Sequence, residues 1–153
     1  MKLLIKKFKP FVPDVFTIKG DSGYDIRAAI KRPLVIRPHG LVKIPTGIGV
    51  EIKYWNFRLF RRYLGRHFEL QVRPRSGFTG DGIIAQYGTI DESYRGEISI
   101  HLYNANDHAV RIEPLARIAQ LVIVPVYKLK IKHTNVLSET ERGANGFGST
   151  GKE

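Results

Sequence analysis

The sequence contains no cysteine and comparatively few acidic residues. The lack of cysteine excludes a disulfide framework, a thiolate metal site and a cysteine nucleophile, which leaves redox-neutral chemistry by oxygen and nitrogen groups. No apolar run approaches the roughly 20 residues that span a bilayer, and Met1–Pro13 lacks the uninterrupted apolar core of a signal peptide. We therefore expect a cytoplasmic protein without membrane contact, in the host cytoplasm if the chain is viral.

Basic residues outnumber acidic ones, 25 against 14, which gives a formal net charge of +11 at pH 7. This charge favours an anionic partner, either a nucleotide or a nucleic acid, although it carries no information on the fold. With 153 residues and 42% hydrophobic content, the chain can form one domain with a real core but not two ordinary domains. We expect a single domain.

Short apolar segments separated by glycine and proline turns predict an all-β chain. No long helical period interrupts them, which indicates a sandwich or jelly roll. The last long strand is nearly all apolar and is expected to be buried on both faces. The expected strands are Leu3–Phe8, Tyr24–Ile30, Pro33–Ile36, Leu41–Ile44, Gly47–Ile52, Glu69–Arg73, Glu97–Tyr103, His108–Ile112 and Arg117–Val126, with Tyr127–Lys132 as a candidate edge strand.

Two segments depart from this pattern. Tyr54–Phe68 mixes aromatic residues with four arginines and fits either an extended hairpin or a short helix. From Ser138 onward the chain is rich in Ser, Thr, Glu and Gly, and it carries too little apolar area to order itself. We therefore expect a folded part at 1–137 and a flexible glycine-rich arm at 138–153.

The stretch Gly88–Ile98 predicts a tight hairpin with an ionisable group at its tip. Its apolar residues alternate with polar ones, and glycines bracket the bend. Asp91 and Tyr94 then lie near the turn. An acid there can orient and deprotonate a water, and an aromatic ring can form a flat wall for another ring. A solvated turn is the alternative for this stretch taken alone.

Three further motifs carry groups that suit phosphate. Pro74–Gly77 offers a guanidinium, a hydroxyl and a glycine. Arg117 and Gln120 are an odd number of residues apart, which predicts opposite sides of a strand. Arg142–Gly151 combines an arginine, an aromatic ring and glycines, as a lid over a nucleotide does, without the spacing of a P-loop. Each motif alone also fits a strand end or a linker.

Together these stretches resemble the five ordered motifs of the trimeric deoxyuridine triphosphatases (dUTPases). In chain order the matches are Gly23–Ala28, Pro74–Gly77, Gly88–Glu97, Arg117–Leu121 and Arg142–Gly151. Five ordered matches are far more specific than any one of them. The resemblance implies a jelly-roll subunit of the β-clip type and a homotrimer with three active sites, each assembled from three subunits. It also implies Mg²⁺-dependent hydrolysis of dUTP to dUMP and pyrophosphate. Such a reaction limits uracil incorporation into DNA and supplies dUMP for thymidylate synthesis.

The resemblance also implies roles for single residues. Asp91 would position the attacking water together with Gln120. Asp25 and Arg117 would hold the residues that contact the substrate without contacting it themselves. Tyr94 would pack under the deoxyribose and exclude a 2′-hydroxyl. Mg²⁺ would be held by the phosphates and water, with no direct protein ligand. The implied substrate-binding residues are Arg75, Ser76, Gly77, Ala85, Gly88, Thr89, Ile90, Tyr94, Ser99, Arg142, Phe147, Gly148, Ser149 and Thr150.

The chain departs from the family pattern by roughly a dozen extra residues between two strands, so that 54–68 reads as an insertion in the 1–137 domain. A protein or nucleic-acid contact is one hypothesis for this insertion, and an elongated surface hairpin is the other. The nearest rival function is that of a dCTP deaminase, which shares the fold; Asp91, Tyr94 and the glycine-rich arm argue against it. A nucleic-acid-binding module is the rival that the net charge favours.

Overall fold

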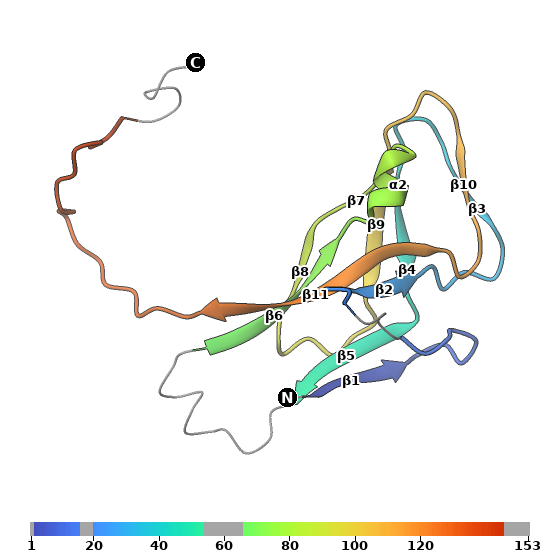
Figure 1. Cartoon of the computed structure of the whole chain (residues 1–153), viewed down its shortest axis with the longest axis horizontal. Coiled ribbons are helices and arrows are strands. Elements are labelled where there is room, and N and C mark those ends of the chain that lie inside the picture. The colour runs from blue at the N-terminus through green and yellow to red at the C-terminus, as the bar shows by residue number, and fades with distance from the viewer. Residues whose placement is uncertain (1, 16–19, 54–65, 146–153) are drawn as a thin grey trace.

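The computed structural model describes residues 2–15, 20–53 and 66–145, and within these ranges the chain is almost entirely β-structure (Figure 1). This confirms the all-β prediction. The one helix of the described residues, α2 (Ser76–Gly80), is far too short to cross a lipid bilayer. The strands are β1 (Lys2–Lys7), β2 (Tyr24–Arg27), β3 (Leu34–Ile36), β4 (Leu41–Pro45), β5 (Ile48–Lys53), β6 (Arg66–Arg73), β7 (Ile83–Ala85), β8 (Gly88–Ile90), β9 (Ser99–Asn104), β10 (Val110–Ile112) and β11 (Arg117–Tyr127).

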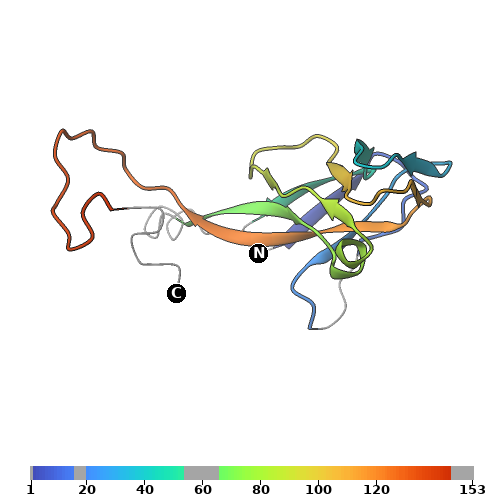
Figure 2. The same cartoon turned by 90° about the horizontal axis from the view of Figure 1, so that it is seen from above.

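Antiparallel pairing joins these strands into four sheets in the described part of the chain. The largest has the order β2-β11-β6-β8, and the next has the order β4-β9-β7. Two-stranded sheets are formed by β1 with β5 and by β10 with β3. Figure 2 shows the long pair of β6 and β11 reaching beyond the packed strands toward the C-terminal segment. The long strand β11 therefore connects the body of the molecule to its C-terminal stretch.

The core lies between the sheets and follows the period of 2 that the sequence predicts. On β9, Ile100, Leu102 and Asn104 are buried, whereas the residues between them are more exposed. From the four-stranded sheet, Leu70 and Leu121 meet the same core. Full burial of each such aliphatic side chain contributes about 1.5–3 kcal/mol. These contacts fix the faces of the sheets, and hence the faces left for a site.

The predicted hairpin at Gly88–Ile98 is wrong in its pairing. Strand β8 pairs with β6, whereas β9 pairs with β4 and β7, so 91–98 connects two different sheets. Alternating apolar residues indicate a strand but do not identify its neighbour, because every antiparallel partner accepts the same pattern. The acid and the aromatic ring nevertheless lie in a turn, as expected.

The strand predictions were also wrong at the C-terminal end. Strand β11 ends at Tyr127, and 128–132 form no strand. Only the first part of β11 is buried, since 122–127 are partly or fully exposed where the strand extends past the core with β6. The short strand β7 was not predicted. Of the undecided segment Tyr54–Phe68, 66–68 begin β6, and 54–65 lie outside the described residues.

Asn104 is fully buried at the end of β9, where its side chain bonds to the backbone of neighbouring segments. Its Nδ2 donates hydrogen bonds to the carbonyls of Ile36, Arg37 and His108 at 3.1, 3.1 and 2.8 Å. Its Oδ1 accepts from Asn106. A buried amide with these partners satisfies carbonyl groups that water cannot reach.

Replacing Asn104 by alanine should lower the free energy of unfolding by about 1–3 kcal/mol, because buried carbonyls lose their donor. Urea denaturation followed by circular dichroism measures this change. The substitution of the exposed Gln86 by alanine is the control and should stay within about 0.5 kcal/mol of the wild type. Equal stability of the two variants would contradict this account of Asn104.

Candidate active site

The Asp25 cluster, defined as Asp25, Arg75, Arg117 and Gln120, lies where β2, β11 and the start of α2 meet. The Asp25 carboxylate accepts a hydrogen bond from Arg75 Nε at 2.7 Å and another from Arg117 Nη1 at 3.1 Å. Arg75 Nη1 also donates to the Arg117 carbonyl at 3.3 Å. Two guanidinium groups around one carboxylate leave one positive charge in excess, which suits an anionic ligand.

A β-bulge brings Gln120 to this cluster. Gln120 lies directly opposite Asp25 in the β11–β2 register, Arg117 lies opposite Arg27, and the register shifts between the two pairs. Directly opposed residues point to the same face of a sheet, and so do residues two apart on one strand. Arg117 and Gln120 therefore share one face. The prediction of opposite sides is wrong because the bulge inserts one extra residue into β11.

The side chain of Gln120 is held by its surroundings. Its Nε2 donates to the Pro74 carbonyl at 3.1 Å. A methyl group added at the buried Gly23 would collide with the Gln120 amide, with Cδ only 3.1 Å away. Glycine at this position therefore leaves the space that Gln120 occupies. The carboxamide oxygen and nitrogen have distinct neighbours, which fixes the orientation of this amide.

The start of α2 is open to solvent. Arg75 has an extended backbone just before the helix, and its carbonyl accepts hydrogen bonds from the backbone and hydroxyl of Thr79. Ser76 and Gly77 are exposed, and a methyl group added at Gly77 would meet no atom within 4 Å. A ligand can therefore approach the backbone beside the Asp25 cluster closely.

A second group of predicted residues surrounds a cavity of about 280 Å³. Asp91 and Tyr94 both line it, together with the end of β8 and the start of β9. The volume is close to the lower end of the range for small-molecule sites. The lining residues are Lys43, Thr89, Ile90, Asp91, Tyr94, Glu97, Ile98, Ser99 and His101.

Tyr94 folds back over the turn that follows Asp91. Its backbone N–H donates to the Asp91 carbonyl at 3.0 Å, and its hydroxyl donates to the Glu97 carbonyl at 3.0 Å. A methyl group added at Gly96 would collide with the Tyr94 ring, and one added at Gly49 would lie 2.8 Å from the Gly96 carbonyl. The ring is thus fixed at both ends, which makes it a defined wall of the cavity.

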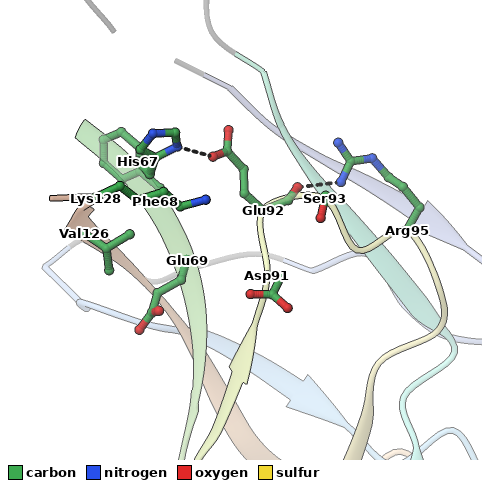
Figure 3. Close-up of a pocket in the computed structure, with 9 residues that line it drawn as sticks. All are labelled: His67, Phe68, Glu69, Asp91, Glu92, Ser93, Arg95, Val126 and Lys128. Atoms are coloured by element: carbon green, nitrogen blue, oxygen red, sulfur yellow. Dashed lines mark hydrogen bonds and ion pairs between the residues drawn. The ribbon is translucent and has the colours of Figure 1, made fainter. Parts of the chain in front are cut away.

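Asp91 also lines a larger cavity of about 420 Å³ on the other side of the turn (Figure 3). This second cavity is bounded by the start of β6 and the end of β11. Its lining residues are His67, Phe68, Glu69, Asp91, Glu92, Ser93, Arg95, Val126 and Lys128. Asp91 therefore has space on both sides, and water can reach its carboxylate.

A single chain keeps the two groups apart. In the four-stranded sheet, β2 with Asp25 is at one edge and β8, which leads into Asp91, is at the other. Three strand spacings separate the edges, a distance of roughly 14 Å, and Gln120 on β11 lies two spacings from β8, a distance of roughly 10 Å. The described residues of one chain therefore do not bring Asp91 within hydrogen-bond reach of Gln120.

Comparison with known proteins identifies the family. The dUTPase family model matches residues 61–151. The chain is 42% identical to the deoxyuridine 5′-triphosphate nucleotidohydrolase of Bdellovibrio bacteriovorus, in an alignment that covers 97% of this chain and 95% of the relative. The chain belongs to the dUTPase family. This membership confirms both the resemblance found in the motifs and the prediction that the chain is an enzyme of the dUTPase class.

Further relatives of this dUTPase-family chain agree in sequence and in fold. The deoxyuridine 5′-triphosphate nucleotidohydrolase of a Hydrogenobaculum species is 41% identical, and the alignment covers 99% of each chain. Among solved structures, a mutant of the Staphylococcus bacteriophage 80alpha dUTPase with dUpNHpp superposes with a TM-score of 0.80. It is 27% identical, with 98% of each chain covered. The arrangement of strands is therefore that of the dUTPase jelly roll.

In this dUTPase-family chain, the other predicted residues differ in burial and in their distance from the cavity. Ala85 is buried in β7, Gly88 begins β8, and neither lines the cavity beside Asp91. Arg142 lies in the exposed C-terminal stretch, where its Nε donates to the Asn145 carbonyl at 2.9 Å. The predicted residues Phe147, Gly148, Ser149 and Thr150 lie outside the described residues.

Four lining residues, Lys43, Glu97, Ile98 and His101, were not predicted from the sequence. Lys43 and His101 are a directly opposed pair on β4 and β9, and Glu97 lies in the loop before β9. Glu97 accepts a hydrogen bond from the Gly47 N–H at 2.8 Å, and Lys9 Nζ lies 3.4 Å from the same oxygen. Only the sheet order could have placed Lys43 beside the cavity, because it is far from Asp91 in the sequence.

The donor set around the cavity fits a magnesium ion that is bound through its substrate. Among the described residues, no group of three or more His, Asp or Glu side chains could hold a metal ion. Asp25 is engaged by two arginines and Glu97 by Gly47 and Lys9, which leaves Asp91 as the carboxylate facing both cavities. Mg²⁺ retains water readily and is often bound through phosphates and one or two carboxylates.

Replacing Gly23 by alanine should displace the side chain of Gln120 without unfolding the chain, since the new methyl group needs the space of the amide. In NMR spectra, the side-chain amide signals of Gln120 should shift, reporting loss of the bond to Pro74. Gly80→Ala is the matched control, because no atom lies within 4 Å of its added methyl group. Unshifted Gln120 signals in Gly23→Ala would contradict the packing described here.

Proposed function

We propose that this chain hydrolyses dUTP to dUMP and pyrophosphate in a Mg²⁺-dependent reaction. One observation carries the proposal: Asp91 and Tyr94, the acid and the ring of the third motif, line the same small cavity. The Asp25 cluster supplies the excess positive charge that a triphosphate needs. The names of the relatives, which are deoxyuridine 5′-triphosphate nucleotidohydrolases, support the choice of substrate.

The nucleobase occupies the cavity beside Asp91. Backbone groups of Thr89, Ile90 and Ser99 imitate a pairing edge for uracil, with Ala85 and Gly88 supporting the strands that carry them. Cytosine would leave buried polar groups without partners, at a cost of about 1–3 kcal/mol for each. The Tyr94 ring packs under the deoxyribose and leaves no room for a 2′-hydroxyl. Selectivity thus comes from a rigid shape and from unsatisfied polar groups in the wrong complex.

The chemistry is an attack of water on the α-phosphorus. Asp91 orients this water and accepts its proton, and Gln120 places the water from the other side. The triphosphate lies on Arg75, Ser76 and Gly77, with Asp25 and Arg117 holding the guanidinium of Arg75 in place. When bound with the triphosphate, Mg²⁺ would neutralise charge on the phosphate oxygens.

The complete site is formed by a homotrimer. One chain keeps Asp91 and Gln120 apart, so a second copy supplies the missing half. The C-terminal stretch also exposes apolar side chains that a neighbouring copy can cover, and a cyclic trimer uses the same surface three times. These side chains are Leu129, Ile131, Val136 and Leu137, each at least 78% exposed.

We assign the remaining parts as follows. The domain spans 1–137 with its insertion at 54–68, and the arm 138–153 closes over the substrate with Arg142 on the γ-phosphate and Phe147 on the uracil. Gly148, Ser149 and Thr150 complete this closure. In the cytoplasm the reaction limits uracil in DNA and supplies dUMP for thymidylate synthesis. The insertion 54–68 is the candidate contact for a protein or nucleic acid, and an elongated surface hairpin is the alternative.

Pyrophosphate release from dUTP, dCTP, dTTP and UTP, each with Mg²⁺, tests the reaction and its selectivity together. Strong preference for dUTP is expected, because the cavity selects uracil among the bases and Tyr94 excludes a sugar with a 2′-hydroxyl. Ammonia release from dCTP would replace the proposal with a deaminase. Inactivity on all four nucleotides would favour a nucleic-acid-binding module, which a steep salt dependence of DNA binding would then reveal.

Replacing Asp91 by asparagine keeps the shape of the side chain and removes the base. We expect folded assemblies that bind dUTP but turn it over about 10²–10⁴-fold more slowly. Stopped assays of pyrophosphate release measure the turnover, and calorimetric titration with dUTP measures the binding. Turnover at the wild-type rate would rule out Asp91 as the group that activates the water.

A further inference from the structure

Arg95 follows Tyr94 in the turn, and its guanidinium binds the turn internally. Its Nη1 donates to the Glu92 carbonyl at 2.7 Å and to the Tyr94 carbonyl at 2.9 Å. These two carbonyls belong to the turn that begins at Asp91 and includes Tyr94, and both of those residues line the cavity of about 280 Å³. One planar cation therefore fixes the relative orientation of two peptide groups.

The same guanidinium links the turn to strand β5. Arg95 Nη2 lies 3.8 Å from the Glu51 carboxylate, two residues before β5 ends at Lys53. Gly96, the next residue, packs against β5 at Gly49. The turn is thus attached to β5 through one ion pair and one close backbone contact.

The opposite side of the turn is attached to strand β6. Glu92 Oε2 lies 3.4 Å from His67 Nδ1, at the start of β6. In Figure 3, Glu92 lies between His67 and Arg95, and Asp91 lies on the same turn just below them. The Asp91 turn, defined as 91–96, is therefore held from two strands at once.

Stability alone does not account for these contacts. The side chains of Arg95 and Glu51 are 50% and 36% exposed, and exposed ion pairs contribute only about 0–1 kcal/mol. The two hydrogen bonds to carbonyls instead act on geometry, since they restrict the backbone between Glu92 and Tyr94. A catalytic group misplaced by about 1 Å can lose about 10²-fold in rate.

We propose that Arg95 is a positioning residue for the reaction, which holds the Asp91 turn against β5 so that Asp91 and Tyr94 keep their places at the cavity. Arg95 does not line the cavity of about 280 Å³ and acts through the turn. The inference rests on the proposed dUTP hydrolysis for its kinetic consequence. Its structural consequence, an ordered turn, is independent of that function.

Replacing Arg95 by methionine removes the carbonyl bonds and the ion pair while it keeps an unbranched side chain. We expect kcat for dUTP to fall about 10–100-fold and the preference for dUTP over UTP in kcat/KM to fall about 10-fold. The loss of preference distinguishes positioning from simple destabilisation, because a smaller folded fraction lowers the rates on both nucleotides equally. Arg95→Lys, which keeps a cation facing Glu51, should recover part of both losses.

Arg111→Met is the matched control. Arg111 is also exposed and pairs with a carboxylate, that of Glu113, but it lies on β10. This variant should keep both kcat and the preference for dUTP within about twofold of the wild type. If Arg95→Met fails to fold, Arg95→Lys compared with Arg111→Lys provides the same comparison.

Hydrogen exchange of the backbone amides provides a measurement that does not require activity. The Tyr94 amide, bonded to the Asp91 carbonyl, should exchange at least about 10-fold faster in Arg95→Met and at the wild-type rate in Arg111→Met. If the wild type does not hydrolyse dUTP, the proposed function fails and this exchange rate alone decides the role of Arg95. Unchanged exchange, or unchanged kcat and selectivity in an active protein, would overturn the proposal.

Discussion

The structure depends on the pairing of β11 with two strands at once. On one side β11 pairs with β2, and on the other it pairs along eight residues with β6. Its buried residues, such as Leu121, complete the core, while its polar face carries Arg117 and Gln120 beside Asp25. The bulge after Arg117 lets β11 contribute both to the core and to the polar face. It allows two consecutive buried residues between two polar ones. Without the bulge, one of the two polar groups would face the core.

Much of the fold follows from the sequence because the alternation of apolar and polar residues along the chain is also found in the strands of the structure. The alternation on β9 and the turn around Asp91 were predicted from these periods. The partner of each strand was not, since β8 and β9 carry patterns that fit a hairpin as well as two separate sheets. The bulge was also missed, because the run Ile118-Ala119 reads as ordinary strand in a sequence and only the register reveals the extra residue.

The sequence predicted some residues that line the candidate site, but not the geometry of the site. The motifs identified Asp91 and Tyr94, and these two line one cavity. Local sequence patterns do not show that two strand spacings separate Gln120 on β11 from the strand that leads into Asp91, because this separation depends on strand order. Lys43 could not be identified either, since its place beside the cavity depends on pairing with His101 across the sheet.

The two attachments of the Asp91 turn lie close to the ends of two strands. Strand β5 ends at Lys53, and β6 begins at Arg66. Glu51 and His67, which hold the turn, lie within two residues of those same ends. The end of β5 and the start of β6 are therefore connected to the Asp91 turn by side-chain contacts, although both strands are far from the turn in the sequence. A displacement of either strand end would therefore reach the Asp91 turn through Glu51 or His67.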